Sequence, residues 1–576
     1  MWAAFIGSIV VITISICYAL PTRDSDIWFH LLYGEYFWQH KTLIADHTLF
    51  SWTPSTNEHI YCTWLPDLFF YLIYNISGLP GLFFFRYFCI SLLVFGCYLF
   101  SRKLNIATNP LTWLIALLAV LMSYWGVIEK PEIFSFLFMS LLCWNWWYIR
   151  AEGNAAWKHC YLIPLIMLVW VNSHGGFVFG LVFLVCIASG ELLNAWTGNA
   201  NSLPSKTRKH MVTALILSIF SLYLTPYGSQ YLYQLSRSLL PTQENMSLIT
   251  PVLAYRSPFN PQDLDAFGLV RNAYISLIII IFLFFKNYRK IEWSSLLANL
   301  VFAFLYTRFY RTTFFWPPIF LFSSLSLMGY SPQISLSRKR WVSSLLVPMI
   351  AVVISVWIAG LSIYKAAFYP DPTNWLGFGI GDMNPVEEAE YIKKNYPTAR
   401  IGNTYNVGSY LLWKLWPENK IFIDARHFPY REWFLEYQKI FRTSLVAKKP
   451  AMAADFLRKY PCDIWCLEHT NYVMRYWFYF SPDWKLAFYG KNASVFVHKD
   501  IPIPKLIKRF GADLNTLKNF NTAFDLLEWA FRIQDWEAVD EILHHMHSYF
   551  FHPEQKQILK QFELTIQQAK KDLNVL

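Results

Sequence analysis

The chain has 576 residues, of which 55% are hydrophobic, 19% aromatic and only 15% charged. Soluble proteins carry about a quarter charged residues, so this composition excludes a single soluble globule. The net charge of +11 does not indicate a nucleic-acid partner, because Lys and Arg gather in short loops between apolar segments. Such loops mark the cytoplasmic side of a membrane protein. The sequence therefore predicts an α-helical multi-pass membrane protein that binds no nucleic acid.

Apolar segments recur through the first 364 residues, and a helix needs about 20 apolar residues to cross a bilayer. Eleven segments are predicted to span it: 3–20, 82–101, 111–127, 132–149, 160–172, 176–193, 211–226, 272–285, 292–306, 313–329 and 341–364. The basic loops between them are 102–103, 150–158, 206–209, 286–290 and 338–340. A cytoplasmic N-terminus places all of these loops on the cytoplasmic side. The apolar stretch 66–77 is interpreted as interfacial, since another span there would invert the later loops.

The first outside loop, at 21–81, opens with two acidic residues directly after a span. Asp24 and Asp26 lie two residues apart, and such carboxylates can hold a divalent cation or serve as a general base. The stretch that follows, to His40, is typical of an amphipathic helix in the membrane interface. If it begins near Asp26, His30 lies on the same face one turn later. A structural role is equally open, in which one of the two Asp residues caps this helix.

Further polar residues stand at the outside ends of the predicted spans: Lys130, Asn172, His174, Arg308 and Arg311. Polar groups at such helix mouths tend to line a substrate path. The two arginines suit a phosphate or pyrophosphate, although they also fit side chains that snorkel to lipid headgroups. A lone His such as His174 is more often an ordinary interfacial residue bound to a backbone carbonyl.

Ordinary polarity returns after the last span, and it predicts two further regions outside the membrane domain of residues 1–364. Residues 365–505 are expected to form an extracytoplasmic α/β domain, with a helix at 386–395 and strands at 399–402, 420–423, 463–467 and 494–498. Asp424 directly follows one of these strands, and pairing with Arg426 to organise a loop is its favoured role. Residues 506–576 predict a helical tail built on a hairpin of 524–532 and 536–547, which we interpret as a surface for a protein partner.

Taken together, these features resemble bacterial multi-pass proteins of the GT-C glycosyltransferase superfamily. The resemblance is carried by 24–31, Gly34, Asp46, Ser51, 64–65, 130–132, Trp170, Asn172, 174–175 and segments of 402–426. Lys130 and Glu132 stand where an Arg and a Gln are expected. Members of the superfamily are similar in using a polyprenyl-phosphate-linked sugar as donor and an acidic residue of the first outside loop as base or metal ligand. The resemblance implies that role for Asp24 and Asp26, and it makes Arg308 and Arg311 candidates for the lipid phosphate.

The sequence therefore leads to the hypothesis of a membrane glycosyltransferase at the outer face of a bacterial cytoplasmic membrane. Asp26 and Asp24 are the expected catalytic residues and the candidate ligands of an Mg²⁺ or Mn²⁺ cofactor. The expected substrate-binding residues are Trp28, His30, Lys130, Asn172, His174, Arg308 and Arg311. The acceptor would be a glycan, a lipid or a protein. A lipid or glycan transporter and a non-catalytic envelope scaffold are the alternatives.

Overall fold

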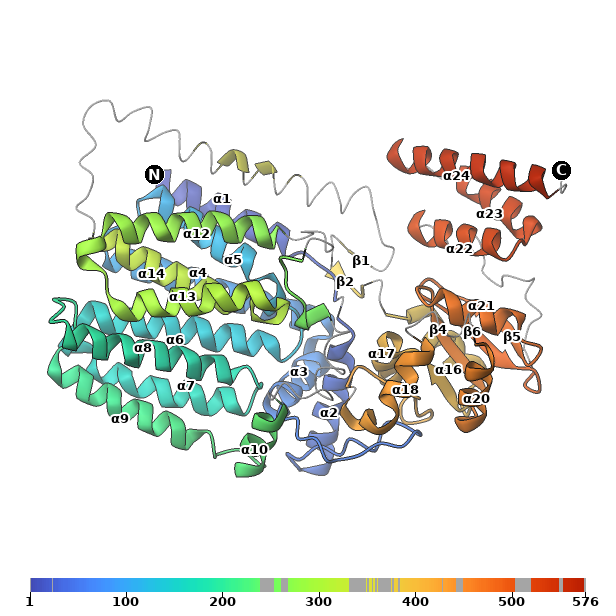
Figure 1. The fold of residues 1–576 in the computed structure, drawn as a ribbon, viewed down its shortest axis with the longest axis horizontal. Coiled ribbons are helices and arrows are strands. Elements are labelled where there is room, and N and C mark those ends of the chain that lie inside the picture. Colours follow the sequence, from blue (N-terminus) through green and yellow to red (C-terminus); the bar gives the residue numbers. More distant parts are fainter. Residues whose placement is uncertain are drawn as a thin grey trace. The chain divides into compact units, whose positions relative to one another are not determined.

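The computed structural model describes residues 2–22, 24–238, 253–260, 268–330, 374–375, 378–381, 384–426, 428–441, 449–502, 520–548 and 553–573, with a few isolated residues between 349 and 360. Two compact units make up the chain (Figure 1). Unit 1 comprises Met1–Ala19, Tyr33–Ala45 and Ile60–Ile363. Unit 2 comprises Leu20–Leu32, Asp46–His59 and Tyr364–Leu576. The long first loop, which the sequence assigns entirely to the membrane domain, thus contributes to both units.

Unit 1 is a bundle of helices (Figure 1). Its helices are α1 (Trp2–Cys17), α3 (Trp64–Ser77), α4 (Leu79–Lys103), α5 (Pro110–Met122), α6 (Glu132–Glu152), α7 (Leu162–Val171), α8 (Phe177–Trp196), α9 (Ser205–Ser221), α10 (Ser229–Ser238), α12 (Leu269–Lys286), α13 (Trp293–Arg308) and α14 (Trp316–Tyr330). The first ten expected segments each coincide with one of these helices. The eleventh, 341–364, lies almost entirely outside the described residues, as does the basic loop 338–340.

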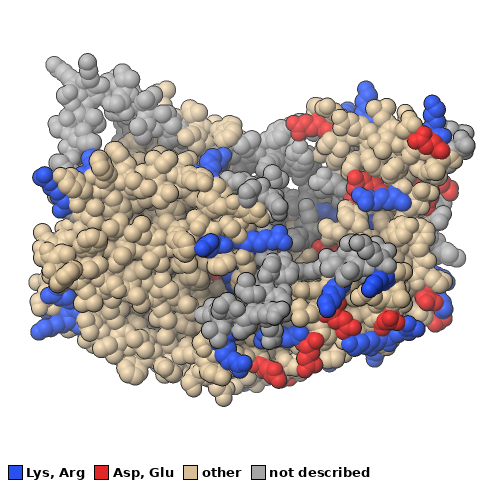
Figure 2. Space-filling model, in the orientation of Figure 1, with Lys and Arg blue, Asp and Glu red and all other residues tan. Residues whose placement is uncertain are grey.

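Three described helices are long and apolar enough to cross a membrane: α4, α8 and α12. Helices α1 and α5 are apolar but shorter, and α7 has only 10 residues, which correspond to about 15 Å of rise. Figure 2 shows the middle of the helix bundle without charged side chains, with Lys and Arg at its edges. This surface is that of a membrane protein, while the total of eleven spans stays a prediction.

Ion pairs tie together the helix ends that carry the basic loops. Arg150, near the end of α6, pairs with Glu191 of α8 and lies 3.2 Å from Glu292, the N-cap of α13. At the end of α4, Lys103 pairs with Glu152. We call this the basic end of unit 1. Helix α6 has 21 residues, so its opposite end, at Glu132, lies about 30 Å away, which is the thickness of a bilayer core.

Unit 2 contains a four-stranded sheet with strand order β3-β4-β6-β5. Its strands are β3 (Ile401–Asn403), β4 (Ile464–Glu468), β5 (Trp484–Tyr489) and β6 (Ala493–His498). Strands β3 and β4 are parallel, whereas β6 pairs antiparallel with both β4 and β5. The helices around the sheet are α16 (Val386–Asn395), α17 (Tyr405–Leu415), α18 (Arg431–Phe441), α20 (Ala451–Lys459) and α21 (Tyr472–Phe480), and a short hairpin of β1 (Asn374–Trp375) and β2 (Phe378–Gly379) precedes α16.

The expected strand at 420–423 is wrong, because side chains satisfy its backbone groups in place of a neighbouring strand. The Asn403 side chain accepts the Phe422 N–H at 3.0 Å. The hydroxyls of Ser51 and Thr53 donate to the Phe422 carbonyl at 3.1 and 2.8 Å. Only an isolated bridge between Ser51 and Ile421 forms. Residues of the first loop therefore take the place of a strand partner in unit 2.

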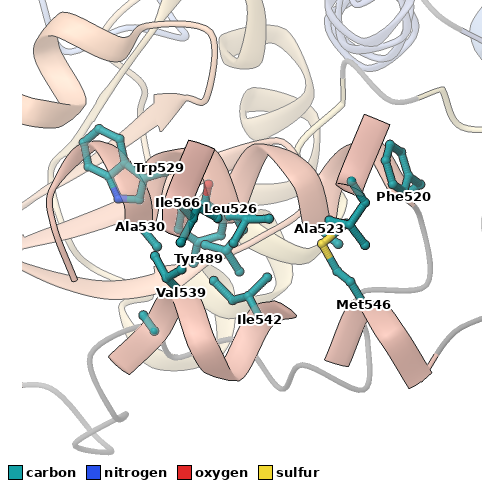
Figure 3. Close-up of a cluster of buried hydrophobic side chains, with 13 residues drawn as sticks. Tyr489, Phe520, Ala523, Leu526, Trp529, Ala530, Val539, Ile542, Met546 and Ile566 are labelled. Atoms are coloured by element: carbon teal, nitrogen blue, oxygen red, sulfur yellow. The ribbon is translucent and has the colours of Figure 1, made fainter. Parts of the chain in front are cut away.

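The described part of the tail has three helices, one more than the sequence predicts: α22 (Phe520–Arg532), α23 (Trp536–Ser548) and α24 (Pro553–Asp572). Figure 3 shows their shared core, in which Trp529, Val539, Ile542 and Ile566 are buried. Tyr489 of strand β5 belongs to the same core. The tail therefore packs against the sheet of its own unit.

Candidate functional site

A group of charged side chains lies at the start of α6. The Oε1 atom of Glu132 lies 3.5 Å from Arg311 Nη2, 3.8 Å from His174 Nε2 and 3.9 Å from Lys130 Nζ. Glu132 occupies the first turn of α6, where the positive end of the helix dipole stabilises a carboxylate. We call Lys130, Glu132, His174 and Arg311 the mouth cluster. It brings together three residues that the sequence predicted from separate loops.

Hydrogen bonds on one nitrogen orient the ring of His174. The backbone N–H of Gly176 donates to His174 Nδ1 at 3.1 Å, so Nδ1 is the acceptor and a neutral ring carries its proton on Nε2. Ser135 Oγ lies 2.8 Å from the same Nδ1 and accepts the indole N–H of Trp170 at 2.8 Å. The Nε2–H of His174 therefore faces Glu132.

The planar guanidinium of Arg311 serves two partners. Its Nη2 faces Glu132, and its Nη1 donates to the Tyr255 hydroxyl. The guanidinium also lies 4.7 Å from the centre of the Tyr255 ring, a cation–π contact. Arg311 belongs to the 3-10 turn Tyr310–Thr312, and its side chain is 31% exposed. It is the most accessible member of the mouth cluster.

The mouth cluster is suited to an anion. Lys130 and Arg311 oppose the single carboxylate of Glu132, so the cluster carries at least one excess positive charge, and a protonated His174 would add another. Separations of 3.5 to 3.9 Å from Glu132 exceed those of direct hydrogen bonds. Guanidinium and ammonium groups are the side chains that most often bind a phosphate or carboxylate of a ligand.

Two of the predicted residues lie apart from this group. The guanidinium of Arg308 lies 4.8 Å from the centre of the Phe304 ring, and its side chain is exposed, as for an arginine that snorkels. The Asn172 side chain donates to the carbonyls of Leu168 and Leu224 and accepts the indole N–H of Trp64, at 2.8 to 2.9 Å. Asn172 therefore ties three segments of unit 1 together.

Asp24 and Asp26 belong to unit 2, at the start of helix α2 (Asp26–His40). The Oδ1 atom of Asp24 accepts the backbone N–H of Asp26 at 3.0 Å, which is the capping role that the sequence left open for it. Asp26 is the first residue of the helix, and it shares a face with His30, as predicted. Asp26 is thus the carboxylate that the local backbone geometry leaves outside the cap.

The helix continues into the core of the protein. Trp28 is 1% exposed, and its indole N–H donates to Asn384 Oδ1 at 2.7 Å. His30 is 1% exposed and its ring packs against Phe29. The seven residues from Ile27 to Tyr33 are all buried, whereas an interfacial helix would show one polar, exposed face. The buried first half of α2 therefore holds Asp24 and Asp26 in place.

The pair of Asp424 and Arg426 organises a buried loop, as the sequence predicts. Arg426 Nε donates to Asp424 Oδ1 at 2.7 Å, and the Tyr430 hydroxyl donates to Oδ2 at 2.7 Å. Burial alone would raise the pKa of Asp424, but the Arg426 guanidinium and these hydrogen bonds hold that pKa below its usual range. Both side chains are completely buried, so the pair is a structural element.

Sequence reasoning missed Glu132, Ser135 and Tyr255 as members of a site. Glu132 follows Lys130 by two residues at a helix start, which is the signal that could have identified it. Nothing in the local sequence links Tyr255 to Arg311, because 56 residues separate them.

Asp24 and Asp26 are the candidate ligands of a divalent cation. Among the described residues, no group of three or more His, Cys, Asp or Glu side chains could hold a metal ion. Mg²⁺ is usually bound by one or two carboxylates together with water and substrate phosphate. Asp24 and Asp26 supply hard oxygen ligands of this kind, so their chemistry fits such an ion when the substrate completes the shell.

No protein-family model and no curated protein matches this sequence. Among solved structures, the apo oligosaccharyltransferase of Archaeoglobus fulgidus matches with a TM-score of 0.53 and 12% sequence identity, over 86% of this chain and 75% of that chain. The same enzyme tethered by a disulfide bond to an acceptor peptide gives 0.51 and 11%, over 87% and 75%. The mycobacterial arabinofuranosyltransferase AftD gives 0.47 and 12%, over 86% and 40%. The archaeal matches show a shared fold.

Proposed function

We propose that this chain, which has the fold of the GT-C glycosyltransferase superfamily, is a membrane glycosyltransferase. It would move a sugar from a polyprenyl-phosphate-linked donor to an acceptor at the outer face of a bacterial cytoplasmic membrane. The observation that carries this proposal is the mouth cluster, a positively charged and largely buried group in which Arg311 is partly exposed. It lies about 30 Å along α6 from the basic end. If the basic end is cytoplasmic, the mouth cluster faces the outside.

The mouth cluster is proposed to bind the phosphate of the donor. Arg311 can present two parallel N–H donors to phosphate oxygens, and Lys130 adds a compact point charge. Glu132 holds both cations near one another before the donor arrives. As the bond between the anomeric carbon and the phosphate oxygen breaks, negative charge grows on the leaving phosphate, and these cations stabilise it.

The base is proposed to be Asp26, with Asp24 as the alternative. The acceptor hydroxyl gives its proton to the carboxylate while its oxygen bonds to the anomeric carbon. The electron pair of the broken bond leaves with polyprenyl phosphate, and the anomeric configuration inverts. A divalent cation held by Asp24 and Asp26 would supply further charge stabilisation of the phosphate. Asp26 is favoured because Asp24 caps α2.

Two other functions compete with this proposal. A lipid or glycan transporter would place ionisable groups at mid-membrane and repeat its halves, whereas the mouth cluster lies at a helix end. A non-catalytic envelope scaffold would tolerate replacement of both acidic residues. The transferase requires at least one of them.

The experiment is mass spectrometry of polyprenyl-linked sugars and envelope glycans in cells lacking the gene. The cells are complemented with wild type, Asp24→Asn, Asp26→Asn, Arg311→Ala or Arg308→Ala at matched expression. We expect a lipid-linked sugar to accumulate without the gene, and a glycan, lipid or protein to lose a sugar. Wild type and Arg308→Ala should reverse both changes, while Asp26→Asn and Arg311→Ala should not. Full restoration by both Asn variants would favour the scaffold or the transporter.

A further inference from the structure

An open groove runs along the surface of unit 1 between helices α1, α4 and α5. Its volume is about 580 Å³, and its lining is almost entirely apolar. Val11 of α1 and Phe95 of α4 line it and are 47% and 53% exposed, so the groove opens to the surface of the bundle. Trp113 of α5 closes its floor near Gly7 of α1.

The length of the groove matches one leaflet of a bilayer. Along α4 it extends from Tyr87 to Tyr98, which is 12 residues and about 16 Å of rise from the first to the last. The hydrocarbon core of a bilayer is about 30 Å thick, so this is the depth that one acyl chain covers. At one end, the Tyr87 hydroxyl donates to the Ser15 carbonyl and joins the two walls.

A positively charged side chain, that of Arg102, lies beyond the other end of the groove. Tyr87, Ser91 and Tyr98 line the groove at spacings that place them on one face of α4, and Arg102 continues this face one turn later. The Arg102 guanidinium lies 5.8 Å from the centre of the Tyr98 ring, and its side chain is exposed. The neighbouring Lys103 is instead paired with Glu152. Arg102 lies at the basic end of unit 1.

We infer that this groove is a binding site for one anionic phospholipid. The acyl chain lies between α1 and α4, and the phosphate meets the Arg102 guanidinium at the level of the headgroups. An Arg side chain beside an apolar groove complements the charge of an anionic lipid. It favours a lipid whose headgroup carries a phosphate and no compensating cation. The inference rests on the membrane embedding of unit 1, and it is independent of the transfer reaction at the opposite end.

The test is native mass spectrometry of the full-length protein in mild detergent, titrated with phosphatidylglycerol or phosphatidylcholine. Ser91→Trp fills the groove, and Arg102→Ala removes the cation. Arg289→Ala is the matched control for the cation, because Arg289 also lies on a tyrosine ring near the basic end. Ile278→Trp is the control for the added indole, because Ile278 is 68% exposed on α12.

Wild type should bind a first phosphatidylglycerol about tenfold more tightly than phosphatidylcholine, as expected for one charge-assisted phosphate contact. Arg102→Ala should lose this preference, and Ser91→Trp should lose the first binding event, while both controls keep them. Equal binding of the two lipids by wild type, or an unchanged preference in Arg102→Ala, would overturn the inference. Competition of polyprenyl phosphate for the same event with higher affinity would also overturn it, because the groove would then hold the donor. Sugar transfer by Arg102→Ala is expected to be normal, because Arg102 lies at the end of unit 1 opposite the mouth cluster.

Discussion

Arg311 makes two contacts that only a forked side chain can make together. One Nη atom faces Glu132 and the other donates to Tyr255, whereas a Lys has a single ammonium group. Arg311→Lys should therefore lower the transfer rate about tenfold or more, as if the arginine were absent. Turnover of the accumulated lipid-linked sugar by purified variants measures this. Arg308→Lys, three residues away and outside the mouth cluster, is the matched control, and an equal loss in both variants would contradict the assignment.

Glu388 in helix α16 predicts a pH dependence of the stability of unit 2. Burial raises its pKa to about 7, although the backbone N–H groups of Asn492 and Ala493, which donate to its Oε1, act to lower the pKa. Between about pH 4.5 and 7 the folded state holds a proton that the unfolded state has lost. The free energy of unfolding should therefore fall as pH rises through this window, by on the order of 3 kcal/mol.

The check is thermal unfolding of the full-length protein in detergent from pH 5 to 8. Glu388→Gln keeps a carbonyl oxygen for the two N–H groups and cannot ionise, so its melting temperature should change less with pH than that of wild type. Parallel pH profiles for the two proteins would show that Glu388 does not titrate in this range.

Among single residues, the sequence predicted which ones lie at the helix ends better than it predicted their contacts in space. It identified Arg311, His174 and Lys130 as mouth residues because polar groups are rare near apolar segments. It could not separate Arg311 from Arg308, since the contact with Glu132 depends on how distant segments pack. The capping role of Asp24 was predictable from the local pattern alone, because the hydrogen bond joins residues two positions apart.

At the level of helices, the stability of the basic end depends on Arg150, which pairs with two carboxylates. Arg150 is 4% exposed between Glu191 and Glu292. Arg150→Met would leave two buried carboxylates without their cation, so it should destabilise the bundle by about 3 to 5 kcal/mol. Thermal unfolding in detergent measures this. Lys103→Met removes a partly exposed pair and should cost about 1 kcal/mol or less, and similar losses in both would refute the special role of Arg150.

The tail is attached to the sheet of unit 2 through Asp525 of α22. Its Oδ2 accepts the Tyr489 hydroxyl at 3.1 Å and lies 3.3 Å from His469 Nδ1 and 3.5 Å from Arg475. Although burial opposes this, these donors and charges lower the pKa of Asp525 to about 2, so the carboxylate is charged at neutral pH. Asp525→Asn would keep the shape and lose the charge.

We expect Asp525→Asn to increase hydrogen exchange of helices α22 and α23, because the tail loses its charged contact with the sheet. Asp540→Asn is the control, because Asp540 pairs with Lys570 on the surface of the tail. If Asp525→Asn exchanges like wild type, the apolar core around Tyr489 alone holds the tail.

Helices were easier to predict than strands in this chain. The ten apolar segments that lie in the described part of unit 1 were found because a helix satisfies its own backbone and needs only an apolar run. The strand expected at 420–423 failed because Ser51 and Thr53, some 370 residues earlier, satisfy its carbonyls. Strand β5 was missed, and its apolar run is interrupted by Lys485, whose side chain is exposed.

For the whole molecule, only a weak pattern of sequence resemblance predicted the fold. The two structures of the archaeal oligosaccharyltransferase that share this fold align with the chain at 11 and 12% identity, so the shared fold leaves little trace in the sequence. The division of the first loop between two units could not be predicted, because it depends on contacts such as that of Thr22 with Gly379.

The most direct test is conversion of the accumulated lipid by the purified protein. A lipid extract from cells lacking the gene is incubated with full-length protein in nanodiscs, an acceptor fraction from the same cells and Mg²⁺, and the lipids are followed by mass spectrometry. Wild type and Arg308→Ala should consume the lipid-linked sugar and release polyprenyl phosphate, while Asp26→Asn and Arg311→Ala should leave the extract unchanged. Equal conversion by all four proteins, or an unchanged extract with folded wild type, would contradict the account of this chain as a polyprenyl-phosphate-dependent glycosyltransferase.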